Sequence, residues 1–170
     1  MRAELTDDPG AFLTRDWTPL VMADTWGTFF HTPAYLKLWW EEFGTGSLVL
    51  ARGSDGNQIV AACAFEVVEG SLRFLGGFDV TDYMGPVSLP GLEEEAARSI
   101  LAAVTAEVAW RGADLRGMPL DSCWYAAMAK AAASLGLSIQ RADDGIAPRL
   151  SLPASNEDYQ IGRASCRERV

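Results

Sequence analysis

The sequence lacks most of the signatures from which a function is usually read. It contains one histidine, His31, and three widely separated cysteines, Cys63, Cys123 and Cys166. One histidine leaves little for a Ser-His-Asp triad, and the cysteine spacing matches no zinc or iron–sulfur motif. We therefore expect no metal site and expect buried free thiols, as in a cytoplasmic protein. Without a partner motif, His31 is a weak catalytic candidate despite its suitable pKa.

The common catalytic and nucleotide-binding motifs are also missing. The chain has no G-x-x-x-x-G-K, G-x-G-x-x-G, H-E-x-x-H, C-x-x-C or G-x-S-x-G. P-loop nucleotide hydrolysis, dinucleotide binding, zinc proteolysis and serine hydrolysis therefore lose their usual sequence support. No apolar run approaches the ~20 residues of a membrane helix, and the acidic N-terminal residues lack the apolar segment of a signal peptide. We expect cytoplasmic localisation and no membrane insertion.

Basic residues are outnumbered by acidic ones. The 170 residues carry 14 Lys and Arg against 23 Asp and Glu, which gives a formal net charge of −9. Such a chain as a whole repels nucleic acid and anionic membranes, so we expect no nucleic-acid partner. Apolar residues make up 49% of the sequence, which excludes a disordered chain, and the length suits one domain.

The last ten residues, IGRASCRERV, differ from this acidic background because Arg163, Arg167 and Arg169 make them basic. A basic tail of this kind often contacts nucleic acid. The same ten residues also result from translating a DNA string that resembles a widely used short-read sequencing adapter. We therefore interpret 161–170 as a non-native processing scar. The expected domain covers residues 1–160 and is the N-terminal part of a longer natural protein.

Hydrophobic periodicity and turn chemistry predict a mixed α/β layer structure. Strands at 48–52, 58–68 and 72–75 are expected to form an antiparallel meander, because Gly-rich turns join them. The helix that starts at Thr32-Pro33 has a hydroxyl N-cap followed by proline. Residues 16–22 are expected to form a short helix or a turn. The other expected helices cover 91–111, 121–135 and 155–159, and the other expected strands cover 113–118, 137–141 and 148–152.

One loop concentrates the reactive side chains. Paired glycines end the strand at 72–75, and Asp79, Asp82 and Tyr83 follow within a few residues. A carboxylate beside a phenol can take a proton from a substrate hydroxyl or amine, or can bind a sugar by hydrogen bonds. Loops held by rigid flanks are where such sites tend to lie. The alternative is a polar turn in which Asp82 caps its own backbone.

Arg116 and the adjacent tryptophans Trp39 and Trp40 are the remaining candidates for substrate binding. Arg116 lies near the end of a predicted strand and suits an anionic substrate, although a surface arginine paired with an acid is an alternative. The two tryptophans can line a groove on the helix that begins at Pro33. An aromatic stripe at this spacing is, however, typical of a hydrophobic core.

Four segments of the chain form an ordered set: HTPAYLKLWWEEFG (31–44), LRFLGGFDVTDYMGPV (72–87), ADLRGMPLDSCWYAAM (113–128) and APRLSLPASNEDYQ (147–160). They contain a helix with a Trp pair, a D-Y-x-x-P loop and an L-R-G strand that leads into a helix. In this order they resemble the N-terminal half of the CelD/BcsL-type acyltransferases of the GNAT superfamily, which are associated with cellulose or exopolysaccharide biosynthesis. The similarity extends over residues 17–160.

The resemblance implies two tandem GNAT-like domains, each with a mostly antiparallel central sheet and helices on both faces. It also implies an N- or O-acyltransferase that moves an acyl group from acyl-CoA, such as acetyl-CoA, to a sugar or glycan precursor. The acyl-CoA-binding turn of the family, Q/R-x-x-G-x-G/A, is absent here and is expected in the missing C-terminal domain. The fragment alone is therefore expected to be inactive and to bind no cofactor. By position, Asp82 and Tyr83 match the D-Y loop, which we place near the groove between the domains.

Two alternatives remain open. This half can be a non-catalytic domain that only binds substrate or packs on its partner domain. The donor can also be an aminoacyl-tRNA, as in the related Fem-type transferases, although the acidic charge disfavours tRNA. A Q/R-x-x-G-x-G/A turn encoded beyond Gln160 would support the acyl-CoA reading. In each of these readings, we expect an exposed apolar patch where the missing domain packs.

Overall fold

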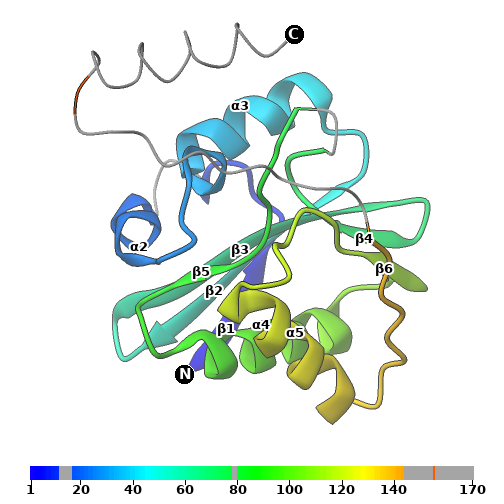
Figure 1. Ribbon diagram of the computed structural model, residues 1–170. Helices are drawn as coiled ribbons and strands as arrows, with labels where there is room; N and C mark the ends of the chain where they lie inside the picture. The colour runs from blue at the N-terminus through cyan, green and yellow to red at the C-terminus, as the bar shows by residue number, and fades with distance from the viewer. Residues whose placement is uncertain (12–16, 78–79, 144–154, 156–170) are drawn as a thin grey trace, which may run out of the picture.

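The computed structural model describes residues 1–11, 17–77, 80–143 and 155 (Figure 1). The described part forms one open sheet of six strands in the order β1-β2-β3-β4-β6, with the short β5 paired to β3. All pairs are antiparallel except β4 and β6, which are parallel. The predicted mixed α/β class is therefore confirmed. The strands are β1 (Arg2–Thr6), β2 (Ser47–Asp55), β3 (Gln58–Val68), β4 (Ser71–Phe74), β5 (Val87–Ser88) and β6 (Gly112–Asp114).

Helices cover both faces of this sheet. Figure 1 shows α2 and α3 on one side and α4 and α5 on the other. Alternate residues of β3 serve the two sides: Cys63 and Phe65 face the core under α4 and α5, while Ala62 and Ala64 face the core under α2 and α3. The helices are α2 (Thr18–Ala23), the 3₁₀ turn η1 (Phe29–His31), α3 (Pro33–Phe43), α4 (Glu93–Glu107) and α5 (Cys123–Ser134).

The meander β2-β3-β4 forms as predicted, with β3 at its centre. The turn between β2 and β3 is tighter than the predicted five-residue loop, because β2 continues through Gly53 to Asp55 with a register shift between Gly53 and Ser54. Gly56 takes φ +57 at the turn, which glycine reaches without strain.

Local capping fixes α3 and α5 where the sequence predicts them. The Thr32 hydroxyl accepts from the Tyr35 N–H at 3.4 Å, and α3 ends before Gly44. The Ser122 hydroxyl caps α5 by accepting from the Tyr125 N–H at 3.1 Å. Cys123, the first residue of α5, is exposed, so the expectation of a buried thiol is wrong there and correct for Cys63.

Several predicted boundaries are wrong. Helix α4 ends at Glu107 rather than 111, because Val108 is extended and the Arg111 N–H bonds the Gly70 carbonyl at 2.8 Å to lead into β6. The strand predicted at 113–118 stops at Asp114, because the chain turns at Gly117, which has φ +78. Residues 137–141 form no strand, because after Gly136 they pair with no neighbour in the described part of the sheet.

Two strands were not predicted: β1, in an N-terminal segment without a clear pattern, and the two-residue β5. The strand predicted at 148–152 lies outside the described residues, as does the helix predicted at 155–159 apart from Ser155. Among the described helices, none is long and apolar enough to cross a membrane.

Candidate functional site

Tyr35 and Thr81 hold the loop that carries the D-Y motif. Thr81 is buried, and its hydroxyl donates to the Gly76 carbonyl near the end of β4. The Tyr35 hydroxyl, from α3, lies 3.1 Å from the Val80 carbonyl oxygen and 2.7 Å from Thr81 Oγ1. Side-chain bonds to α3 and to the end of β4 thus fix the backbone just before Asp82 from two sides.

Asp82 and Tyr83 follow directly on this fixed segment. Asp82 is exposed and Tyr83 is half-buried. Within the described residues, neither side chain has a hydrogen-bond or ion-pair partner, so the alternative in which Asp82 caps its own backbone is not observed there. The third carboxylate candidate, Asp79, lies outside the described residues.

The D-Y loop and the L-R-G segment lie side by side. The Met84 N–H donates to the Gly117 carbonyl at 3.2 Å. Tyr83 directly precedes Met84 and Arg116 directly precedes Gly117, so both candidates lie next to this contact. The Arg116 Nε–H donates to both carboxylate oxygens of Asp114 at 3.0 Å. This exposed pairing corresponds to the alternative considered for Arg116, a surface arginine with an acidic neighbour.

The two tryptophans divide between core and surface. Trp39 is buried under the start of the loop: a Cβ added at Gly77 would lie 2.7 Å from Trp39 Cζ2. Its indole Nε1 is buried and has no hydrogen-bond partner in the described part of the chain. Trp40 is half-buried beside Gly44. Trp39 therefore supports the loop from below, whereas Trp40 stays partly accessible at the end of α3.

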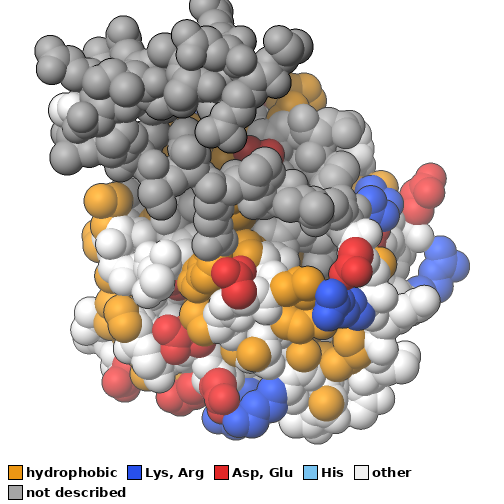
Figure 2. All heavy atoms as spheres, in the orientation of Figure 1, with side chains coloured by type: hydrophobic (Ala, Val, Ile, Leu, Met, Phe, Trp, Pro, Cys, Tyr) orange, Lys and Arg blue, Asp and Glu red, His pale blue; other side chains and the backbone are white. Residues whose placement is uncertain are grey.

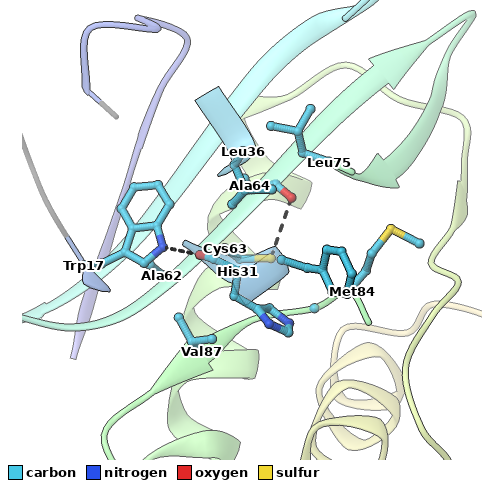
Figure 3. Close-up of a pocket in the computed structure, with 11 residues that line it drawn as sticks. Trp17, His31, Leu36, Ala62, Cys63, Ala64, Leu75, Met84 and Val87 are labelled. Carbon is cyan, nitrogen blue, oxygen red and sulfur yellow. Dashed lines mark hydrogen bonds between the residues drawn. The ribbon is translucent and has the colours of Figure 1, made fainter. Parts of the chain in front are cut away.

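A small cavity behind the loop contains His31, Cys63 and Met84 (Figure 3). Its volume is about 10 Å³, which is close to the minimum for one water molecule. Burial raises the pKa of the Cys63 thiol, so this cysteine stays protonated and unreactive. This cavity is part of the packed interior and has no room for a substrate.

His31 serves the structure around this cavity. Its Nδ1 accepts from the Thr28 N–H at 3.1 Å, and its carbonyl accepts from the Trp17 indole at 3.0 Å. Burial lowers the pKa of His31 to about 4, although the nearby carboxylate of Asp24 acts in the opposite direction. The imidazole is therefore neutral at pH 7, and its Nδ1 is occupied by the hydrogen bond from Thr28.

A buried carboxylate that sequence reasoning missed joins three elements. Asp24 Oδ2 accepts from the Ser88 N–H and from Trp124 Nε1, both at 2.9 Å, and Oδ1 accepts from the Trp26 N–H at 2.8 Å. These bonds connect the end of α2 to β5 and α5. The only sequence signal is an acid at a helix C-terminus, where the helix dipole disfavours it. With three donors on the two oxygens, Asp24 is a structural residue.

Searches against protein-family models, curated proteins and solved structures found no match for this chain. Among the described residues, no group of three or more His, Cys, Asp or Glu side chains is arranged to hold a metal ion. The D-Y loop places the exposed carboxylate of Asp82 next to the phenol of Tyr83, on a backbone that Tyr35 and Thr81 hold.

Proposed function

We propose that this chain is the acceptor-binding half of a GNAT-type N- or O-acyltransferase that acts in the cytoplasm. The enzyme would move an acyl group from acyl-CoA to a sugar or glycan precursor, with a second domain of the same natural protein holding the donor. Support comes from the four resembling segments and from the topology: antiparallel β1 to β4, then α4, then β6 parallel to β4, then α5.

The carboxylate of Asp82, which has no hydrogen-bond or ion-pair partner within the described residues, is the observation on which this proposal rests. Tyr35 and Thr81 fix the backbone beside it, so its position does not depend on a flexible turn. A carboxylate with free lone pairs can accept hydrogen bonds from sugar hydroxyls, or take the proton of the attacking hydroxyl or amine. Preorganised placement of this kind is what an acceptor-binding group needs.

Acyl-CoA does not fit the corresponding helix N-terminus in this chain. Helix α4 begins with Glu93, Glu94 and Glu95, and the Gly91 N–H that precedes it already donates to Glu93 at 3.1 Å. Figure 2 shows acidic side chains gathered near the start of α4. A pyrophosphate needs free N–H groups and no negative charge there. We therefore assign no donor site to this half and propose that it is inactive alone.

Exposed apolar side chains beside the loop favour a contact with a second domain. Phe29 is 67% exposed and packs edge-on against Tyr35 at 5.2 Å, and Val80 is 52% exposed next to the Tyr35 hydroxyl. Apolar groups gathered in one place on a surface mark interaction sites. The same observation favours the second candidate function, in which this half binds or packs without contributing a catalytic group.

The test compares two carboxylate variants of the full natural protein. Asp82→Asn is expected to lower kcat for acyl transfer by roughly 10²-fold, the scale of a lost acid–base group, with little change in thermal stability. Asp55→Asn, at the exposed β2–β3 turn, is the matched control and is expected to leave kcat unchanged. Equal kcat values for the two variants would show that Asp82 is not part of the site. The role that remained would be binding or packing without a catalytic group.

The donor assignment has its own measurement. This chain alone, incubated with acetyl-CoA and candidate sugar acceptors, is expected to release no free CoA thiol. Release by the chain alone would show that the donor binds in this half and would overturn the assignment.

A further inference from the structure

Strand β1 is at the edge of the sheet, and among the described strands it pairs only with β2. An open groove of about 500 Å³ lies along it, and all five residues of β1 contribute to its lining. The lining includes both faces of the strand: Ala3 and Leu5 pack toward α4, while Glu4 lies opposite Arg52 of β2. The groove therefore follows the edge of β1 that no other described strand covers, where backbone N–H and C=O groups are open to pairing.

The charges in this groove are poorly paired in a single chain. The Arg52 side chain is only 7% exposed. Among the residues that the structure describes, its Nε has no hydrogen-bond partner and its ion pair with Glu4 spans 3.9 Å. Arg2, 84% exposed, lies 3.8 Å from the same Glu4 carboxylate. The buried Arg52 Nε, which has no hydrogen-bond partner among the described residues, carries a desolvation cost. The edge therefore carries charged side chains that lie close together but form only long ion pairs within the described part of one chain.

We propose that this edge is an interface with a second copy of the chain, formed by antiparallel pairing of β1 with the partner's β1 about a two-fold axis at Ala3. In this register Ala3 lies opposite its own counterpart, and Arg2 and Glu4 each lie opposite the other's counterpart in the partner. Directly opposite charges on one sheet face stabilise a strand pair. The interface is isologous, so each favourable contact occurs twice.

The sequence of β1 selects this register over its neighbours. A shift by one residue would place the apolar face, with Ala3 and Leu5, beside the polar face of the partner. A shift by two would place Glu4 opposite the partner's Glu4, which is repulsive. Centred on Ala3, the pairing instead places each Glu4 between Arg52 of its own chain and Arg2 of the partner. The pairing of opposite charges and the matching of apolar and polar faces therefore both favour the register centred on Ala3.

The test uses two charge reversals that fail alone and complement each other. In Arg2→Glu, both charged positions of the edge become acidic; in Glu4→Arg, both become basic. Each variant alone therefore faces like charges across the two-fold axis and is expected to raise the dimer Kd about tenfold, from two pairs of roughly 0.5–1 kcal/mol each. An equimolar mixture places opposite charges at every pair and is expected to recover wild-type affinity as a heterodimer.

Sedimentation velocity over a concentration series measures these constants, and far-UV circular dichroism confirms that each variant is folded. Glu42→Arg, an exposed reversal on α3, is the matched control and is expected to associate like the wild type. A wild-type chain that stays monomeric at every concentration overturns the proposal and leaves the edge to an extended segment of another protein. A dimer that neither reversal weakens, or that mixing does not restore, also overturns it.

Discussion

Replacing Asp24 by alanine would remove one acceptor group from three donors. The Ser88 N–H and the Trp124 indole N–H, both at 2.9 Å from Oδ2, are buried, and the Trp26 N–H at 2.8 Å is partly buried. A buried donor left unpaired costs about 1–3 kcal/mol. Two such donors predict a loss of about 4 kcal/mol in the free energy of unfolding, a large share of the ~5–15 kcal/mol of a typical domain.

Urea unfolding, followed by far-UV circular dichroism, measures this loss. Trp124→Phe is the companion variant: it removes one donor and keeps most of the ring packing, so we expect a loss of about 1–2 kcal/mol. In the double variant the Trp124 bond is already absent, and Asp24→Ala should cost about 1–2 kcal/mol less than in the wild type. A loss below about 1 kcal/mol for Asp24→Ala, or strict additivity of the two changes, would refute the reasoning.

Two further stability predictions follow from single positions. Because the pKa of His31 is about 4 when folded and 6.5 as its ordinary value, the stability it contributes is complete above pH 6.5 and is lost as the pH falls toward 4, by about 3 kcal/mol. His31→Asn should therefore lose less stability between pH 7 and pH 4 in urea titrations; equal losses would contradict this. Gly77→Ala, with φ +62 and a Cβ 2.7 Å from Trp39, should cost more than about 2 kcal/mol, whereas Gly56→Ala, with φ +57 and open space, should cost about 1 kcal/mol. Equal melting shifts would show that the contact with Trp39 is not the cause.

The elements that the sequence predicts well are those determined by neighbouring residues. Thr32 and Ser122 cap α3 and α5 through bonds to residues three positions ahead, and such signals are visible in a linear sequence. The β2-β3-β4 meander depends on short turns and is equally local. Strand β1 is different, because its five residues, RAELT, have little β-propensity and become a strand by pairing with β2.

The same distinction between local and long-range contacts applies to the candidate site. Asp82 and Tyr83 stand out as a motif, and their loop position is evident from the flanking glycines. Asp24 and Trp124 are 100 residues apart, so nothing in the sequence indicates that one accepts a hydrogen bond from the other. The role of Trp39 beneath the loop is equally non-local, because it depends on where Gly77 passes over the indole.

The Tyr35 hydroxyl reaches 45 and 46 positions along the chain to meet Val80 and Thr81. The orientation of the D-Y motif therefore depends on α3 as well as on the Gly76 carbonyl that follows β4. A related chain with an intact D-Y-x-x-P segment but a one-residue insertion in this helix would have the same motif residues in a different orientation. A comparison of this loop between related chains therefore has to include the helix together with the motif.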